Sequence, residues 1–471
     1  MTAPANILVI MADEMRRDAI GALGPDFLKT PNLDALAARG TVFSNAYTPS
    51  PICVPARAAI ACGRPVHRIG TWDSATPWAG TPRSWMHDLR DAGIDVTSIG
   101  KLHFRAGCDS GFSREILPMH VHGEGWTVGL LRENLPDYPA TRLLAEDVGY
   151  GDTDYNRFDR QVTAAACAHI AAKKGERWVA FVSYVSPHYP LRAPDAYAGL
   201  YDPDALPAPV PETAADDHPE LRRMRRFFDY DDHFDSRRAS EARAAYYALC
   251  SFIDDQVGQL MRTLEETGQS EDTLVLFMSD HGDMLGDHGI WTKQVMYEAS
   301  AGVPLIAAGP GFAAGAECAH PVSLTSLYAT VLRAAGIDAE APDPASPPFQ
   351  EIAAMPEGTD RTAFSEYHDG GSTRGMFMVR WDRWKVVHFV GERPQLFDLA
   401  TDPQERDDLA LAGHNDILAE GVRRLRAICD PDAVNARAFA DQKARIAELG
   451  GEAACRALGD FDFTPVKEAV G

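Results

Sequence analysis

The sequence has no apolar run long enough to cross a bilayer, so it offers no candidate transmembrane helix. The short apolar run at 7–12 has no basic region before it, and we expect no signal peptide. The eight cysteines, at positions 53, 62, 108, 167, 250, 318, 429 and 455, form no C-x-x-C pair and no disulfide-framework spacing. These absences predict a reduced, cytoplasmic protein that does not bind membranes.

Positive charge is also scarce. The chain has 45 lysines and arginines against 68 aspartates and glutamates, which gives a net charge of −23 and a pI near 5.0. This balance argues against non-specific binding to nucleic acid or to anionic membranes. An anionic substrate would therefore need a locally positive pocket. At 471 residues, the chain is long enough for one large domain and a smaller one.

One stretch organises the rest of the chain: CVPARAAIACGR at 53–64. It follows a loop-like Thr-Pro-Ser-Pro segment, and its alanine-rich composition predicts a helix. Cys53 would then lie near a helix N-terminus, where free N–H groups and the helix dipole favour an anion. Arg57, one turn later, adds a fixed positive charge over the same place. The alternative interpretation is a buried structural cysteine at the start of a helix.

Polar side chains follow two predicted buried strands. The apolar strand at 6–12 ends at Asp13, and the strand at 273–278 ends at Asp280 and His281 in glycine-rich sequence. Open α/β sheets bind their ligands at the carboxyl ends of parallel strands, so we expect these side chains to meet there. The alternative for Asp13 is a cap for the following helix.

Basic residues follow two further predicted strands. Lys101 and His103 come directly after the strand at 95–99, on an extended turn where they share a face suited to gripping the oxygens of an anion. His188 follows the strand at 178–184, with a proline on either side of it that stiffens the loop. Taken alone, Lys101 and His103 also fit a solvated loop, and His188 an exposed loop histidine.

The stretch at 53–64 resembles the signature of the type I, formylglycine-dependent sulfatases, which belong to the alkaline phosphatase superfamily. Their pattern is Cys-x-Pro-Ser-Arg followed by Thr-Gly-Arg. The matching residues are Cys53, Pro55, Arg57, Gly63 and Arg64. Ala56 replaces the serine and Cys62 replaces the threonine, but the Cys-x-Pro-x-Arg core remains.

A second motif also resembles this family: Asp-His-Gly-Asp-x-x-Gly-Asp-His-Gly at 280–289, followed by Lys293. Many sulfatases carry two aspartates after the first strand and an asparagine beside the last aspartate. Glu14 and His281 replace these residues here, which is similar to the branch of choline sulfatases, arylsulfatases and phosphonate monoester hydrolases. Whether Glu14 binds metal is left open by the sequence.

The resemblance implies an α/β fold like that of alkaline phosphatase, with a large mixed sheet flanked by helices. The expected division is a catalytic domain at 1–336, a linker at 337–360 and a C-terminal subdomain at 361–471. Alternating patterns at 376–380, 385–389 and 395–399 predict that this subdomain contains a small antiparallel sheet. Its helical tail resembles one that supports oligomer contacts, so we expect a homo-oligomer, either a dimer or a tetramer.

The resemblance also implies a mechanism. A formylglycine-generating enzyme would oxidise Cys53 to an aldehyde, whose hydrate attacks sulfur to form a covalent sulfo-enzyme hemiacetal. One divalent metal ion would be held by Asp13, Cys53, Asp280 and His281. Oxygen donors with one imidazole suit Mn²⁺ better than Ca²⁺, although Ca²⁺ is common in the family. The other expected catalytic residues are Arg57, Lys101, His103, His188 and Lys293, which orient the nucleophile, neutralise charge and protonate the leaving oxygen.

Two rival functions remain. The same residues could hydrolyse phosphonate monoesters or phosphodiesters, because sulfate and phosphate esters are both tetrahedral and differ mainly in charge. Alternatively, the chain could be a non-catalytic metal-binding protein in which Cys53 stays a thiol, a reading that Ala56 and Cys62 keep open. The favoured reading is an arylsulfatase-like sulfuric ester hydrolase acting on a small sulfate ester.

Overall fold

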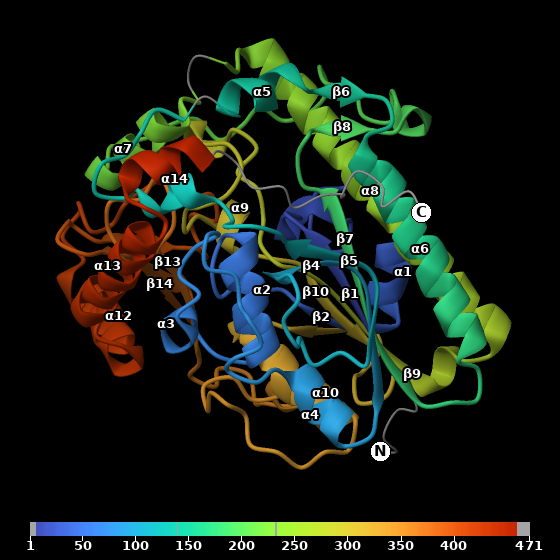
Figure 1. Cartoon of the computed structure of the whole chain (residues 1–471). Coiled ribbons are helices and arrows are strands. Elements are labelled where there is room, and N and C mark those ends of the chain that lie inside the picture. The colour runs from blue at the N-terminus through green and yellow to red at the C-terminus, as the bar shows by residue number, and fades with distance from the viewer. Residues whose placement is uncertain (1–5, 139, 231–232, 459–471) are drawn as a thin grey trace.

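The computed structural model describes residues 6–458 except 139 and 231–232 (Figure 1). An eight-stranded mixed sheet forms its centre. In spatial order its strands are β11 (Ala316–Cys318), β2 (Gly40–Phe43), β10 (Leu305–Ala308), β9 (Thr273–Ser279), β1 (Asn6–Asp13), β7 (Trp178–Pro187), β4 (Asp95–Arg105) and β5 (Arg114–Val121). The neighbours β9, β1, β7, β4 and β5 are all parallel, and β10 is antiparallel to both of its neighbours. The predicted fold class is confirmed.

Strand β1 shows why the sequence folds this way. Its residues are all buried, and alternate side chains point to opposite faces of the sheet. Leu8, Ile10 and Ala12 join the hydrophobic core on one face, whereas Ile7, Val9 and Met11 join the core on the other. An apolar strand without polar alternation therefore lies in the middle of the sheet.

Helices cover both faces of this sheet, as Figure 1 shows. On one side lie α1 (Pro31–Ala38), α6 (Asp154–Ala172) and α8 (Ser236–Thr267), and on the other α2 (Cys53–Cys62), α4 (Trp85–Asp91) and α10 (Leu327–Ala334). The predicted helix at 243–266 forms the larger part of α8. It ends where predicted, because Gly268 has a φ of 71° and adopts the left-handed conformation that terminates a helix.

One sequence prediction about this region is wrong. The strand predicted at 95–99 continues to Arg105, so Lys101 and His103 lie within β4 rather than on a turn after it. The pairing of β4 with β5 shifts register on either side of Lys101. The segment 106–160 contains the edge strand β5 and the first part of helix α6.

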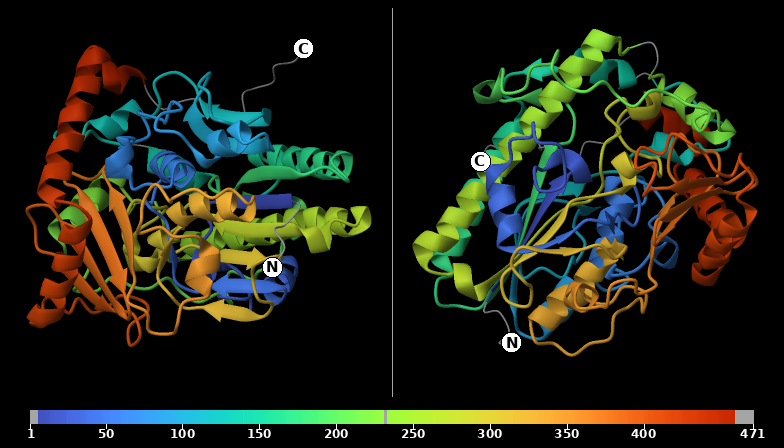
Figure 2. Two further views of the ribbon diagram at one scale, coloured as in Figure 1. Left: turned by 90° about the horizontal axis from the view of Figure 1, so that it is seen from below. Right: turned by 180° about the vertical axis from the view of Figure 1, so that it is seen from behind.

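A second sheet lies towards the C-terminus, and Figure 2 shows it beside the main sheet with the last helices packed along it. Its four antiparallel strands are β13 (Thr362–Tyr367), β14 (Met376–Trp381), β15 (Trp384–Phe389) and β16 (Gln395–Asp398). Helix α12 (Asn415–Ile428) packs on β14 and β15, and α13 (Pro431–Glu448) and α14 (Glu452–Leu458) follow it. The predicted small antiparallel sheet is confirmed, with β13 as an additional strand.

The connecting segments contain further short elements. These are β3 (Ala46–Tyr47), α3 (Val66–Ile69), α5 (Ala140–Glu146), β6 (Gly149–Tyr150), β8 (Arg192–Ala193), α7 (Pro219–Phe228), α9 (Glu298–Ala301), β12 (Val322–Ser323), α11 (Phe349–Ala353) and six 3₁₀ turns at 17–19, 127–130, 195–197, 270–272, 287–289 and 324–326. Helix α11 lies within the expected linker and buries Phe349 and Ile352. The division of the chain into domains stays a prediction.

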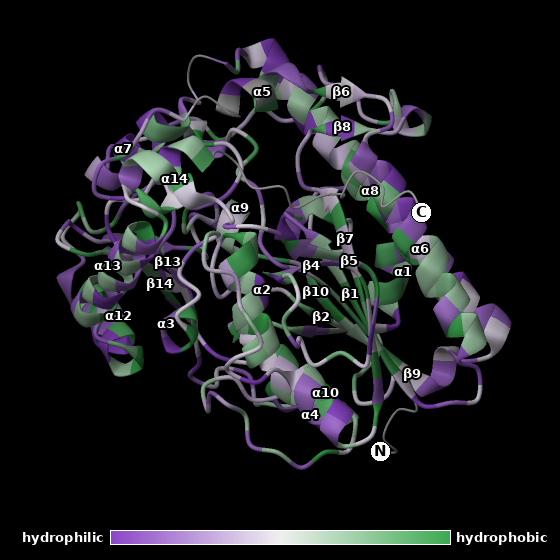
Figure 3. Ribbon diagram, viewed as in Figure 1, coloured by the Kyte–Doolittle hydropathy of each residue, from purple (hydrophilic) through white to green (hydrophobic). Residues whose placement is uncertain are grey.

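Apolar residues concentrate on the central strands, and hydrophilic residues on the outward sides of the helices (Figure 3). Among the described residues, no helix is long and apolar enough to span a bilayer.

Candidate active site

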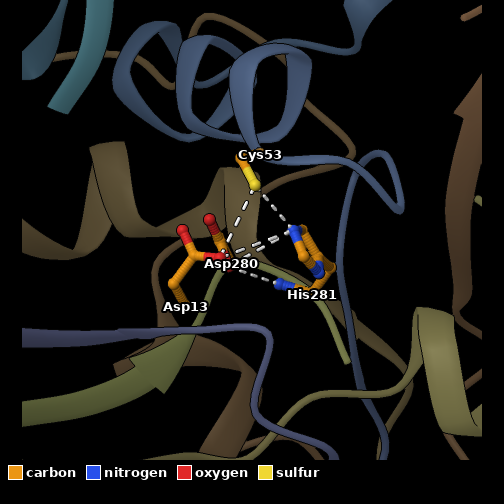
Figure 4. Close-up of side chains that lie close together, drawn as sticks. All are labelled: Asp13, Cys53, Asp280 and His281. Atoms are coloured by element: carbon orange, nitrogen blue, oxygen red, sulfur yellow. Dashed lines mark hydrogen bonds and ion pairs between the residues drawn. The ribbon is translucent and has the colours of Figure 1, made fainter. Parts of the chain in front are cut away.

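Four potential metal ligands meet at the carboxyl ends of the central strands (Figure 4). Asp13 is the last residue of β1, Asp280 and His281 follow β9, and Cys53 is the first residue of α2. The Sγ atom of Cys53 lies 3.1 Å from Nε2 of His281 and 3.5 Å from Oδ1 of Asp13. All four side chains are buried, and their ligand atoms lie within 4.8 Å of one another. The structure thus brings together the four residues predicted as the metal site.

The arrangement of these atoms fits a divalent ion. Nδ1 of His281 lies 3.0 Å from the carbonyl oxygen of Gly282, an acceptor, so Nδ1 carries the proton and Nε2 presents its lone pair towards Cys53 and Asp13. Oδ1 of Asp280 lies 3.7 Å from the same Nε2 atom and is held by the backbone N–H groups of Glu14 and His281. Two carboxylates and one imidazole are donors suited to Mn²⁺, and the carboxylates are also typical ligands of Ca²⁺.

Two cations compensate the buried carboxylates. Arg57 donates from Nε to Oδ2 of Asp280 at 2.7 Å and from Nη2 to Oδ2 of Asp13 at 3.0 Å. Its Nη1 atom donates to the carbonyl oxygen of Lys101 and to Oγ of Ser183. Nζ of Lys101 lies 2.5 Å from Oδ2 of Asp13. Arg57 therefore fixes the positions of both carboxylates. It also places a positive charge one turn after Cys53.

These ion pairs shift the acidities of the site. Burial alone would raise the pKa of Asp13, but Lys101 and Arg57 lower it well below its ordinary value. Burial and then Asp13 raise the pKa of the Cys53 thiol to about 12. Asp13 is therefore ionised at neutral pH, whereas the unmodified Cys53 side chain is a neutral thiol and a weak nucleophile.

Lys293 and His188 form a second group beside the first. Nζ of Lys293 lies 2.7 Å from Oε2 of Glu14, and Nε2 of His188 lies 3.4 Å from the same oxygen. Nδ1 of His188 donates to the carbonyl oxygen of Tyr189 at 2.7 Å, and the two rings lie with centroids 4.1 Å apart. The Tyr189 ring also lies under Lys293, 5.2 Å from Nζ to the centroid.

This second group shows which side chains surround Glu14, whose role the sequence leaves open. Its carboxylate faces Lys293 and His188, and it is not one of the four converging ligands around Cys53. Asp13, Glu14 and His188 also lie close enough together to hold a cation, but Lys293 already pairs with Glu14. Burial raises the pKa of Glu14 to about 8, an effect that Lys293 opposes.

His103, the remaining predicted site residue, is buried on β4 with a φ of 57°. Burial and the neighbouring Lys101 lower its pKa well below the ordinary value, so the imidazole is neutral.

The sequence analysis did not identify several residues that support the site through hydrogen bonds. Oγ of Ser183 accepts from Arg57, and the hydroxyl of Tyr246 donates to the carbonyl oxygen of Glu14 at 2.7 Å. Asp159 on α6 accepts the backbone N–H groups of Val185 and Ser186, just before His188. No motif marks these residues, because each acts on a segment far away along the chain.

Open α/β sheets bind their ligands at the carboxyl ends of the strands, and a metal ion at such a site can activate a nucleophile and stabilise developing negative charge. The sulfatase family model matches residues 5–337, and the C-terminal model of N-sulphoglucosamine sulphohydrolase matches residues 286–427. The chain belongs to the sulfatase family and is a sulfuric ester hydrolase, as its sequence resemblance predicted.

Two sequence relatives agree with this assignment, and a solved structure agrees with the fold. The chain is 34% identical to a choline-sulfatase of Rhizobium meliloti over 438 residues, covering 87% of this chain and 83% of the relative. It is 29% identical to arylsulfatase K of Danio rerio over 465 residues, covering 91% and 84%. The phosphonate monoester hydrolase of Agrobacterium radiobacter has the same fold, with a TM-score of 0.73, 24% identity and coverage of 90% of this chain and 95% of that one.

Proposed function

We propose that this chain hydrolyses sulfate monoesters with a formylglycine made from Cys53, assisted by one divalent ion, Mn²⁺ or Ca²⁺, held by Asp13, Asp280, His281 and the oxidised side chain. The convergence of Cys53 with these three residues at the N-terminus of α2 carries the proposal. When present, the aldehyde hydrate supplies the nucleophile and the ion lowers its pKa. The high pKa of the Cys53 thiol supports the need for oxidation, because a neutral thiol is a poor nucleophile.

The remaining residues act through charge and orientation. Arg57 holds Asp13 and Asp280 in the geometry that a metal requires. Lys101, Lys293 and His103 border the place where the sulfate oxygens bind, and the two ammonium groups stabilise the negative charge that develops there. Nδ1 of His188 keeps its proton on the Tyr189 carbonyl. Burial and Lys293 lower the pKa of His188 well below its ordinary value, so Nε2 carries no proton in the free protein. Nε2 therefore takes up a proton together with the anionic substrate and then delivers it to the leaving oxygen.

The alcohol part of the substrate is less defined. The ring of Tyr189 lies against both His188 and Lys293, an apolar face that suits an aryl or a cationic alcohol. The similarity to a choline-sulfatase and to arylsulfatase K supports the same two classes of alcohol.

We further propose maturation by a formylglycine-generating enzyme and assembly as a homo-oligomer. Light scattering would test the oligomeric state.

The decisive experiment combines mass and turnover. Protein co-expressed with a formylglycine-generating enzyme should show the aldehyde mass at the Cys53 peptide, and should hydrolyse 4-nitrophenyl sulfate faster than 4-nitrophenyl phenylphosphonate and bis(4-nitrophenyl) phosphate. Aldehyde formation with the reverse preference would favour the phosphonate or phosphodiester reaction. A thiol that persists, without turnover of any of these esters, would favour the non-catalytic metal-binding alternative.

A further inference from the structure

Strand β7 is irregular at the point where it delivers His188. Met11 of β1 pairs with Ser183, and Asp13 pairs with Pro187. One residue of β1, Ala12, therefore faces three residues of β7, at 184–186. Such a bulge redirects the end of a strand and takes backbone N–H groups out of the regular ladder. Buried N–H groups removed from a ladder need another acceptor.

Asp159 of α6 supplies this acceptor. Its carboxylate accepts the N–H of Val185 at 2.8 Å and the N–H of Ser186 at 2.9 Å. The side chain is fully buried. A carboxylate that bridges two consecutive N–H groups fixes the local backbone more firmly than a single neutral hydrogen bond.

The same helix also touches the His188 ring. Tyr155 lies one turn before Asp159, so the two side chains share a face of α6. The Tyr155 ring meets His188 edge-on, with centroids 6.4 Å apart and an interplanar angle of 86°. The N–H of His188 donates to the carbonyl oxygen of Val185, which ties the imidazole-bearing residue to the bulge that Asp159 holds.

We propose that Asp159 and Tyr155 are positioning residues that aim Nε2 of His188 at the leaving oxygen of the substrate. Asp159 sets the backbone of the β7 bulge, and Tyr155 limits the tilt of the imidazole ring. This inference rests on the proposed role of His188 as the proton donor to the leaving group. Within the described part of the chain, neither side chain forms a hydrogen bond or ion pair with the proposed metal ligands.

The consequence is a dependence on the leaving group. Proton donation matters most for a basic leaving oxygen, such as that of phenyl sulfate, and least for an activated one, such as that of 4-nitrophenyl sulfate. A misaimed His188 should therefore slow phenyl sulfate selectively. Because the loss arises in the transition state, it should appear in kcat rather than in KM.

Asp254 provides a matched control. It is also a buried aspartate, and its carboxylate accepts the consecutive backbone N–H groups of Asn32 and Leu33 at the start of α1. Burial raises the pKa of both Asp159 and Asp254 to about 6. Asp254→Asn therefore reproduces the structural cost of Asp159→Asn away from His188.

The experiment compares kcat for phenyl sulfate and 4-nitrophenyl sulfate in mature, metal-loaded enzyme. Asp159→Asn should lower the ratio of phenyl sulfate to 4-nitrophenyl sulfate turnover by about 10- to 100-fold. Asp254→Asn should leave the ratio unchanged although it destabilises the fold. Tyr155→Leu should lower the ratio as well, and Tyr155→Phe, which keeps the ring, should not. If Asp159→Asn does not fold, the comparison of Tyr155→Leu with Tyr155→Phe still tests the inference.

His188→Ala separates this inference from the function on which it rests. If His188→Ala lowers the ratio strongly while Asp159→Asn and Tyr155→Leu behave like Asp254→Asn, the positioning role is wrong and the proton donor stands. If His188→Ala leaves the ratio unchanged, His188 is not the proton donor and both assignments are overturned.

Discussion

Among the buried charge clusters of the described residues, two look alike in composition and differ in geometry. One is the active site around Asp13, Asp280, Arg57 and Lys101. The other, which we call the tether, consists of Arg17, Tyr47, Glu298, Lys385 and Glu405. In the tether, Nζ of Lys385 lies 2.9 Å from Glu298 and 2.7 Å from Glu405, while Tyr47 and Arg17 donate to Glu298.

The two clusters differ in the groups that face the oxygen lone pairs of their carboxylates. Each carboxylate of the tether faces a cation of the tether, so the cluster neutralises itself and joins β15 to α9 and to the segment after β1. In the active site, oxygen, nitrogen and sulfur atoms of Asp13, His281 and Cys53 converge on one another. Burial of charge is common to both clusters and therefore does not identify a functional site. A functional site is identified instead by lone pairs of several side chains that converge on one another and that no cation of the cluster occupies.

The strongest test of this comparison is Cys53→Ala. Turnover of 4-nitrophenyl sulfate should fall by about 10⁴-fold or more, because the residue that becomes the nucleophile is gone. The free energy of unfolding should change by no more than about 1 kcal/mol. Parallel measurement of kcat and of urea unfolding checks both statements. Residual turnover within tenfold of wild type would contradict the nucleophile assignment.

Lys385→Met should have the opposite profile. It leaves the buried Glu405 without its cation and Glu298 with Arg17 alone, and it should lower the free energy of unfolding by about 3–5 kcal/mol. The kcat per folded molecule should stay close to wild type. Lys443→Met is the control: Lys443 pairs with Glu133 at the surface, both are more than half exposed, and its loss should cost less than about 0.5 kcal/mol. A large loss of kcat in folded Lys385→Met would place the tether in the catalytic machinery.

Metal removal should affect the active site and leave the tether intact. After chelation, adding Mn²⁺ or Ca²⁺ at about 100 times its Kd should stabilise the protein by about 2.7 kcal/mol, measured as a rise in Tm. Asp280→Asn should abolish this rise, whereas Lys385→Met should keep it. An unchanged metal response in Asp280→Asn would show that the ion binds elsewhere.

The tether also predicts a pH dependence. Burial alone would raise the pKa of Glu298, but Lys385 and Arg17 lower it well below its ordinary value of 4.5. A lowered carboxyl pKa contributes stability that is present above pH 4.5 and is lost as the pH falls towards the folded-state value. Between about pH 5 and pH 3, wild type should lose about 2 kcal/mol more than Glu298→Gln. Urea unfolding at each pH checks this, and parallel curves for the two proteins would refute it.

The smallest effect is expected on α7, where Arg222 pairs with Asp217 at the surface. Both side chains are more than half exposed, so Arg222→Ala should change the free energy of unfolding by less than about 0.5 kcal/mol and leave kcat unchanged. A clear loss of turnover would mean that this basic helix takes part in substrate binding. The free energy of unfolding and the kcat of Arg222→Ala therefore provide the baseline for the effects measured in the two buried clusters.

Local patterns were enough to predict much of the site. The sequence predicts Cys53 at the start of a helix, and Asp13 and Asp280 at the ends of apolar strands. The structure places the three residues at these positions. Parallel strands share one carboxyl edge, so residues at strand ends could be expected to meet. The antiparallel strands near the C-terminus were predicted for a similar reason, because alternation along one segment reveals a half-buried strand.

The predictions failed where pairing with a distant segment changed the local structure. Lys101 and His103 appeared to follow a strand, but β4 continues through a register shift that depends on β5. The sequence leaves the role of Glu14 open, because its partner Lys293 lies 279 residues away along the chain. Asp159 carried no signal at all, since its partners are two backbone N–H groups on another strand.

The sequence by itself determined the chemical groups of this protein and the elements that carry them, because hydrophobic periodicity and short motifs are properties of contiguous residues. It also indicated the family, through two motifs that resemble those of the sulfatases. Tertiary structure alone decided which buried charges neutralise one another and which lone pairs converge. Those outcomes depend on strand register and on contacts between segments hundreds of residues apart, and no local pattern encodes them.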